Sequence, residues 1–206
     1  ESQEIPWKQM FTTPAIWALM INHFCSNWVL YMLLAWLPSY FRSTLDLSII
    51  NAGIFSAAPW LSMFIIGNLG GLVADKMVSG GLSLTTVRKI MQCTGLIGSA
   101  VCLLAVQNVS EPYAALGWMC GALGIAALTW SGFVPNHLDI APRYADVLMG
   151  ITNTAGTIPG IIGVAITGWL VDSTGTYASA FALCAAVNIF GAVVWLFFST
   201  AERVID

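Results

Sequence analysis

The sequence predicts an all-α membrane protein, a bundle of six transmembrane helices, and three observations support this fold class. The 206 residues are 58% hydrophobic and only 8% charged, whereas soluble domains carry roughly 25% charged residues. Such a chain cannot cover its surface with polar groups, so we expect that surface to face lipid. The apolar residues also gather in six stretches, and each is long enough to cross a bilayer, which takes about 20 residues per helix.

The six predicted spans contain no Asp, Glu, Lys or Arg; they cover residues 14–37, 50–73, 90–107, 113–133, 147–171 and 178–199. Residues 1–13 are expected to end a central cytoplasmic loop that continues from sequence before residue 1. Residues 14–199 form the bundle, and residues 200–206 form a cytoplasmic tail. Two connections are expected to be long, at 74–89 and 134–146, and they hold most of the loop charge.

The basic residues predict the orientation of the bundle. Of the seven Lys and Arg residues, only Arg42 falls on the side opposite the termini. Cytoplasmic loops carry an excess of Lys and Arg. We therefore expect both termini on the cytoplasmic side of the membrane.

The first span carries the most polar residues near its middle. Asn22, His23 and Asn27 are expected near the mid-depth of the membrane, and His23, Asn27 and Tyr31 recur every four residues on one helix face. An ionisable residue at that depth marks a functional-site candidate, so we favour a stripe that lines a polar cavity. The alternative is packing against a neighbouring helix through interhelical hydrogen bonds.

The second span ends in a Gly-rich segment with a carboxylate, and a basic pair opens the third span. The residues are Gly71, Asp75, Arg88 and Lys89. We expect Asp75 to pair with a basic side chain or to cap a helix end. The pattern resembles the short-loop motif of the major facilitator superfamily, and the resemblance implies a role in gating and assembly rather than substrate contact.

Residues 136–160 combine a short charged loop with a glycine-rich fifth span. In the loop, Asp139 and Arg143 are expected to form a salt bridge beside His137. Gating and structural roles are assigned to Asp139 and Arg143, and also to Pro159, which is expected to kink the fifth span. Asn153 has two open interpretations, repair of the backbone at that proline or lining of a cavity.

Several other classes of function are disfavoured. The five cysteines lie in apolar runs without a CxxC pair, so they predict reduced, buried side chains rather than a disulfide or metal framework. A net charge of −3 does not favour nucleic acid as a partner. His23 and His137 fall on different predicted elements without acidic partners in the membrane. We therefore expect no metal site, no cofactor and no enzymatic activity.

Four segments together resemble one family, the anion:cation symporters of the major facilitator superfamily. They are HFCSNWVLYMLLAWLPSYF (23–41), GLSLTTVRKIMQ (81–92), NHLDIAPRYADVLMGITNTAGTIPG (136–160) and FSTAERVID (198–206). This family includes type I sodium/phosphate cotransporters, sialin, vesicular glutamate transporters and plant plastid anion transporters. The chain is similar to the C-terminal half, which implies six helices arranged as an inverted 3+3 repeat.

The resemblance implies transport of an anion coupled to Na⁺ or H⁺, by alternating access with an N-terminal six-helix half. That half carries the family's main anion-binding arginines and coupling carboxylates, and His23 is the only ionisable group predicted inside the membrane here. The cavity-facing residues carried over from the resemblance are His23, Asn27, Ser131 and Asn153, with Tyr31 added from the stripe. Ser26 stands where the glutamate transporters carry arginine, so the resemblance favours phosphate or a small organic anion, a carboxylate or ascorbate.

Two functional hypotheses remain open at this point. One is the half-transporter, in a plastid envelope or thylakoid membrane, an endomembrane or the plasma membrane. The other is a truncated membrane module that does not transport and only associates with partner helices.

Overall fold

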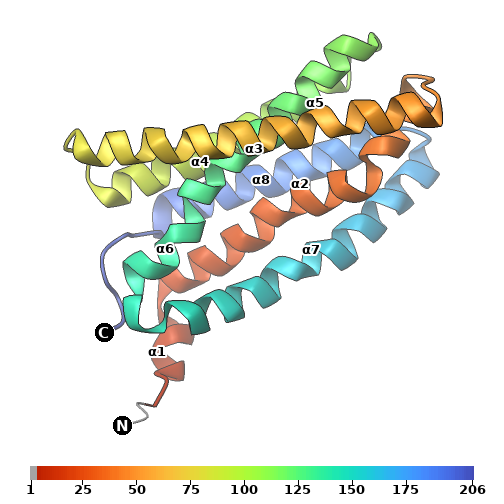
Figure 1. Cartoon of the computed structure of the whole chain (residues 1–206). Coiled ribbons are helices and arrows are strands. Elements are labelled where there is room, and N and C mark those ends of the chain that lie inside the picture. Colours follow the sequence, from red (N-terminus) through yellow and green to blue (C-terminus); the bar gives the residue numbers. More distant parts are fainter. Residues whose placement is uncertain (1–3) are drawn as a thin grey trace.

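The computed structural model describes residues 4–206, which form long helices that alternate in direction. The elements are α1 (Trp7–Thr12), α2 (Pro14–Thr44), α3 (Ile49–Ser79), α4 (Leu84–Val106), α5 (Pro112–Ala126), η1 (Ala127–Ser131), α6 (Phe133–Ile140), η2 (Pro142–Tyr144), α7 (Ala145–Thr174) and α8 (Ala178–Phe198). Both termini lie at the same end of the bundle (Figure 1), which we call the termini end, opposite the far end. Six helical segments of the described chain are long and apolar enough to cross a membrane, which confirms the predicted fold class.

Polar side chains fix the starts of the spans that follow short loops. The hydroxyls of Ser48 and Ser83 accept backbone N–H groups in the first turns of α3 and α4. The carboxylate of Glu111 does the same for α5. These contacts satisfy N–H groups that have no partner inside the helix, so each span begins at a defined residue.

The two connections predicted to be long loops are largely helical, and that prediction was wrong. α3 continues to Ser79 rather than ending near residue 73, and α6 with η2 makes most of residues 134–146 helical. Asp75 and Lys76 are exposed on the extension of α3. A helix satisfies its own backbone groups in lipid and in water alike, so charged residues end the membrane span without ending the helix.

The fourth span is broken near its termini end. α5 passes into the 3₁₀ turn η1, and Gly132, with φ −98° and ψ −88°, separates η1 from α6. The N–H of Phe133, at the start of α6, donates to Gln92 Oε1 on α4 at 3.1 Å. A Cβ on Gly132 would lie 2.6 Å from the same oxygen, so the glycine allows Gln92 to reach the break.

The packing of the first three spans matches that of the last three when α2 corresponds to α5, α3 to α7 and α4 to α8. Under this correspondence, the contact of α2 with α7 matches that of α5 with α3, and the contact of α4 with α5 matches that of α8 with α2. The corresponding helices α4 and α8 pack on each other. Because three crossings separate corresponding helices, the two sets run in opposite directions. The fold therefore has the inverted 3+3 repeat of secondary transporters.

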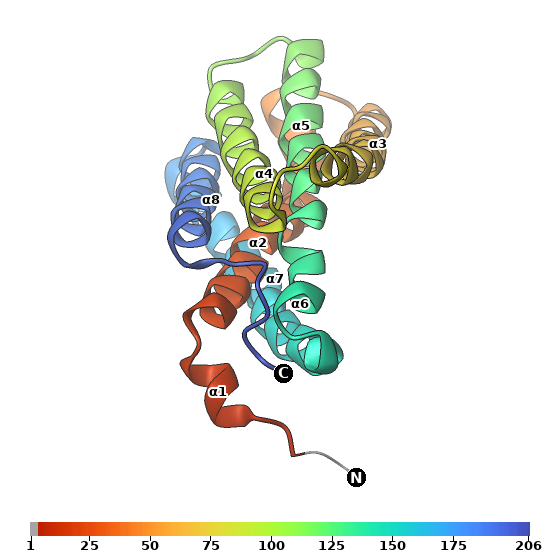
Figure 2. The ribbon, with the colours of Figure 1, turned by 90° about the vertical axis from the view of Figure 1, so that its left-hand side faces the viewer.

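α3 and α7 form the edges of the bundle and run along the top and bottom of Figure 1. Seen from the termini end, α8, α4, α5 and α3 follow one another across the molecule (Figure 2). In the apolar stretch of α3 and in that of α7, only 22% of the residues are buried, against 61% in that of α2. Large exposed apolar side chains include Ile50, Ile54, Leu61, Phe64 and Leu72 on α3 and Ile161 and Trp169 on α7. These edges require lipid or another apolar surface against them.

The last residues cross the termini end and pack against α6. The N–H groups of Val204 and Ile205 donate to the carbonyl of Ile140, and Asn136 Nδ2 donates to the Thr200 carbonyl at 2.9 Å. The Ile205 side chain is buried in a cluster with Met10 and Ile140. Residues 199–206, which we call the tail, therefore belong to the packed structure.

Candidate functional site

The polar stripe of α2 faces α7 rather than an open cavity. His23 Nδ1 lies 3.0 Å from Thr152 Oγ1, and Asn27 Nδ2 donates to the carbonyl of Gly156 at 2.8 Å. His23 is buried and Asn27 is partly buried. For these two residues the structure shows the interhelical hydrogen bonds that were the alternative to cavity lining.

Glycines on α7 allow this close approach. A Cβ on Gly156 would lie 2.5 Å from His23 Cδ2, and one on Gly160 would lie 3.4 Å from the ring of Tyr31. Pro159, between them, is buried and lies inside a continuous helix. Gly156 and Gly160, four residues apart, thus give α7 a face without side chains, against which His23, Asn27 and Tyr31 pack.

One hydroxyl joins two histidines from different helices. Thr152 Oγ1 lies 3.0 Å from His23 Nδ1 and 2.7 Å from His137 Nε2. His137 Nδ1 lies 2.8 Å from the carbonyl of Val134, which can only accept a hydrogen bond. In the neutral His137 ring, Nδ1 therefore carries the proton and Nε2 accepts from the Thr152 hydroxyl. His23 then donates its Nδ1–H to the same hydroxyl oxygen.

The position of His137 differs from the sequence prediction. It lies on α6, in the fourth membrane-spanning segment, and is 2% exposed, so the assignment of His137 to a loop turn was wrong. His23 is consequently not the only ionisable group in the interior. His23 itself lies off-centre, because it is nine positions after Pro14 in a helix of 31 residues. This places it about 9 Å from the middle of the helix.

A second buried network joins α2, α4 and the break in the fourth span. Gln92 Nε2 donates to Asn22 Oδ1 at 2.9 Å and to Ser26 Oγ at 3.0 Å, while its Oε1 accepts from Phe133. Both donors and the acceptor of the amide are thus used. Sequence analysis did not single out Gln92, although a glutamine inside an apolar span is itself a signal.

Arg88 and Asp139 form an ion pair between α4 and α6. Arg88 Nε lies 2.7 Å from Asp139 Oδ2, and Arg88 Nη1 donates to the Ser131 carbonyl at 3.2 Å. Arg143 is exposed on η2. The predicted salt bridge between Asp139 and Arg143 is therefore wrong, because Asp139 turns towards the third span instead.

The other residues of the Gly-rich motif do not meet. Within residues 4–206, the Asp75 side chain has no salt bridge or hydrogen bond, so neither predicted role, pairing or capping, is present. Lys89 Nζ donates to the Leu196 carbonyl at 2.8 Å. A Cβ on Gly71 would lie 4.0 Å from Ser131 Oγ, which places η1 of the fourth span beside α3.

Ser131 and Asn153 are not brought to the histidine stripe. Ser131 is 9% exposed on η1. Asn153 is exposed on α7, and its side chain makes no hydrogen bond in the part of the chain that the structure describes. Repair of the backbone at Pro159 is therefore not its role, while its exposure on an edge helix is compatible with a cavity shared with another bundle.

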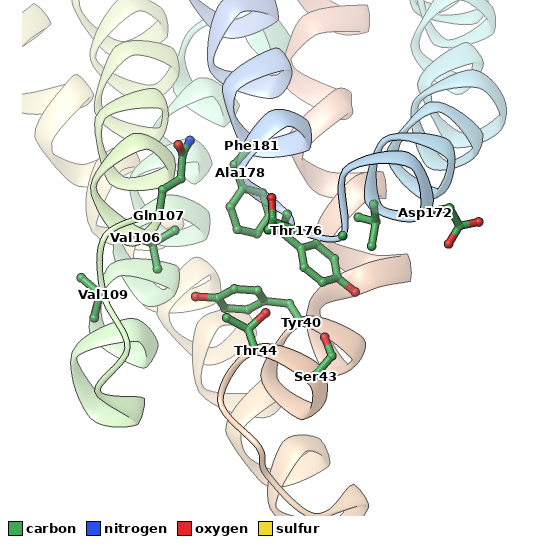
Figure 3. Close-up of a pocket in the computed structure, with 13 residues that line it drawn as sticks. Tyr40, Ser43, Thr44, Val106, Gln107, Val109, Asp172, Thr176, Ala178 and Phe181 are labelled. Carbon is green, nitrogen blue, oxygen red and sulfur yellow. The ribbon is translucent and has the colours of Figure 1, made fainter.

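A cavity of about 620 Å³ lies at the far end (Figure 3). It is lined by side chains from α2, α4, α7, α8 and two loops, including Tyr40, Gln107, Thr176 and Phe181, and by none of the predicted cavity residues. Tyr177, between α7 and α8, also borders it. Burial raises the pKa of the Tyr177 phenol, so this phenol is uncharged at neutral pH, whereas Asp172 of α7 adds a carboxyl group to the lining.

The arrangement supplies hydrogen-bond donors and proton acceptors, but no fixed charge in the interior. Every charged side chain in the six membrane-spanning segments lies within six residues of a segment end. No cluster of three metal-binding side chains occurs among the described residues. An anion bound at mid-depth would need a cation that these spans do not provide.

An inverted 3+3 repeat of six spans is the architecture found in each six-helix half of many secondary transporters. Residues 1–164 match the family model of the Major Facilitator Superfamily. The chain belongs to this superfamily. The relatives that it matches are named as transporters and not as enzymes.

The chain is similar over nearly its whole length to plant transporters. It is 42% identical over 204 residues to "Probable anion transporter 1, chloroplastic" of Oryza sativa subsp. japonica, covering 99% of this chain and 38% of that protein. It is 42% identical over 202 residues to "Ascorbate transporter, chloroplastic" of Arabidopsis thaliana, covering 98% and 37%. It is 40% identical over 204 residues to "Sodium-dependent phosphate transport protein 1, chloroplastic" of Arabidopsis thaliana, covering 99% and 40%. The chain thus spans about two fifths of the length of these relatives.

Proposed function

We propose that this chain is half of a secondary transporter that moves an inorganic or organic anion, coupled to Na⁺ or H⁺. The observation that carries the proposal is the 40–42% identity to anion, ascorbate and phosphate transporters over nearly the whole chain. Phosphate and the small organic anion ascorbate are the substrates that these names favour. The uncharged polar interior is consistent with a half that orients the anion while the positive charge comes from elsewhere.

The proposed partner is an N-terminal six-helix half, docked on the edges formed by α3 and α7. Two facts support it. These helices bury the smallest share of their apolar residues, and the relatives are about two and a half times as long as the matched region, since it covers 38% of the first of them. Asn153, exposed on α7, would then face the space between the two halves.

The chain is an integral multi-pass membrane protein, and we place it in a plastid membrane because its relatives are named chloroplastic. We place both termini on the cytoplasmic side. Lys8, Lys76, Arg88 and Lys89 gather at the termini end, and Arg42 lies at the far end of α2, as the positive-inside rule requires.

The test is uptake of labelled phosphate and labelled ascorbate into proteoliposomes under an imposed Na⁺ or H⁺ gradient. One preparation contains residues 1–206, and a second contains the same residues joined to an N-terminal six-helix half from the 42% identical Arabidopsis relative. We expect uptake only by the joined protein. A joined protein that folds and inserts but moves neither anion would support the module that associates without transporting. Uptake by residues 1–206 alone would contradict the proposal that the N-terminal half supplies the positive charge for the anion.

A further inference from the structure

We propose that the bridge His23–Thr152–His137 is a proton-binding site, and that the ion coupled to transport is H⁺ taken up by this pair of histidines. The inference rests on the proposed transport function and names its coupling ion. It is carried by the geometry of one hydroxyl shared between two imidazoles that come from α2 and α6, with the hydroxyl on α7.

The bridge has a direction. Because Val134 fixes the proton of His137 on Nδ1, the Nε2 lone pair of His137 accepts from Thr152, and Thr152 accepts from His23. A continuous path of hydrogen bonds therefore runs from His23 to the α6 backbone. His23 Nε2, at the other end, has no hydrogen-bond partner among residues 4–206, so it is the point at which a proton can enter.

The site can hold one added proton without leaving a buried group unpaired. A proton that binds His23 Nε2 releases the Nδ1 proton to Thr152, and Thr152 passes its own hydroxyl proton to His137 Nε2. One N–H bond forms on each ring, the Nδ1–H bond of His23 breaks, and the O–H bond of Thr152 breaks and re-forms. Thr152 then accepts from His137 Nε2–H and donates to His23 Nδ1. The added charge is one positive unit, on His137.

No fixed charge competes for this proton. On α6 and α4, Asp139 and Arg88 bond to each other, and Asp146 of α7 accepts from the N–H of Val147. Lys89 donates a hydrogen bond to the carbonyl of Leu196 on α8. The ring of Phe133 packs on the ring of His23 at a centroid distance of 4.9 Å. The titratable groups that face the bridge in the described structure are thus the two histidines themselves.

Protonation would also change the packing of three helices at once. A buried positive charge is costly unless it is hydrogen-bonded or paired, and His23 approaches α7 only because Gly156 has no side chain. A protonated bridge therefore favours a helix arrangement that brings a negative charge, such as the substrate anion, to His23. This coupling of proton and anion is what a symporter requires.

The experiment uses the joined two-half protein in proteoliposomes with a pH-sensitive dye inside, and phosphate or ascorbate as the anion. Two rates are measured: uptake driven by a proton gradient, and counterflow exchange of the anion at equal pH. The wild type is expected to carry protons inward with the anion. Exchange without anion-dependent proton movement would overturn the inference while leaving anion transport intact. Absence of exchange would instead refute the proposed function.

The variants separate the bridge from general packing. Thr152→Val removes the hydroxyl at nearly constant volume, and we expect proton-driven uptake to fall at least about tenfold further than exchange. Thr152→Ser keeps the hydroxyl and should retain proton-driven uptake. Thr154→Val is the matched control, because its hydroxyl is exposed and bonds only to its own helix at Gly150. If Thr152→Val does not fold, His137→Gln is judged by the same two rates. Equal loss of both rates in the folded variant would refute the proton site.

Discussion

Arg88 Nε and Asp139 Oδ2 lie 2.7 Å apart at the termini end of the bundle, and their side chains are only 14% and 10% exposed. Arg88 also donates to the carbonyl of Ser131. Since Ser131 and Asp139 lie on either side of Gly132, a single guanidinium of the third span joins both sides of the break in the fourth. The pair therefore sets the angle between η1 and α6.

Asp139→Asn is expected to impair folding or gating rather than substrate affinity. The change leaves a mostly buried guanidinium without its counter-charge, which costs about 3 kcal/mol, the lower end of the range for a buried pair. Thermal unfolding in detergent should show lower stability, and uptake should show a reduced maximal rate with KM little changed. The exposed pair Arg203–Asp206, with side chains 60% and 95% exposed, provides the control: Asp206→Asn should change neither quantity. An intact maximal rate with a raised KM would contradict the assignment.

Gly156→Ala is expected to separate α2 from α7. The added methyl group would lie 2.5 Å from His23 and 2.9 Å from Asn27 Nδ2, and such overpacking costs about 1–3 kcal/mol. Gly150→Ala is the control on the same helix, because nothing lies within 4 Å of its Cβ position and alanine favours helix by about 1 kcal/mol. The two melting temperatures should move in opposite directions. A stabilised Gly156→Ala protein would show that the two helices do not make this contact.

Gln92→Leu is expected to destabilise the bundle by about 2 kcal/mol or more, because it leaves the N–H of Phe133 and the oxygen of Asn22 without partners. The same substitution at Gln107 removes an amide whose Nε2 has no hydrogen-bond partner in the described structure, and it should cost far less. Comparison of the two melting temperatures measures the network itself. Equal falls in melting temperature for Gln92→Leu and Gln107→Leu would mean that the hydrogen bonds of Gln92 do not contribute to stability.

Ile205→Ala is expected to release the tail from the termini end. Ile205 is 1% exposed, and truncation of such a side chain costs at least about 2 kcal/mol where the site cannot collapse. Limited proteolysis should then cut within residues 199–206 at a protease concentration that spares the wild type. Arg203→Ala, at an exposed neighbour, should leave the cleavage rate unchanged. Unchanged protection in the Ile205 variant would show that the backbone hydrogen bonds to Ile140 hold the tail by themselves.

The sequence was sufficient for the number of spans and for the class of fold, because each span is a long run without charge. It was insufficient for the ends of α3 and α6, since hydropathy reports where lipid ends and not where the helical backbone ends. His137 was assigned to a loop for this reason.

The hydrogen-bond partners of the polar residues could not be predicted from the sequence either. The i, i+4 spacing placed His23 and Asn27 on one face of a helix, but spacing along one helix cannot identify the helix opposite. Thr152 is followed by Asn153 and Thr154, so nothing in the sequence singles it out, and Gln92 lies in an apolar span. Only the fold brings both residues to α2. Likewise, Asp139 has Arg143 as its neighbour in the chain and Arg88 as its partner in space.

The inverted repeat has unequal seams. Across α2 and α7 the side chains of His23, Asn27 and Trp36 all hydrogen-bond to the partner helix. Across the corresponding seam of α3 and α5 within residues 4–206, Ser62 makes a single such bond, to the Cys120 carbonyl. Directional bonds resist sliding, whereas apolar contacts tolerate it. For the proposed transport function, in which the bundle changes the side to which it opens, we therefore expect shear between α3 and α5, while α2 and α7 move together as one rigid body.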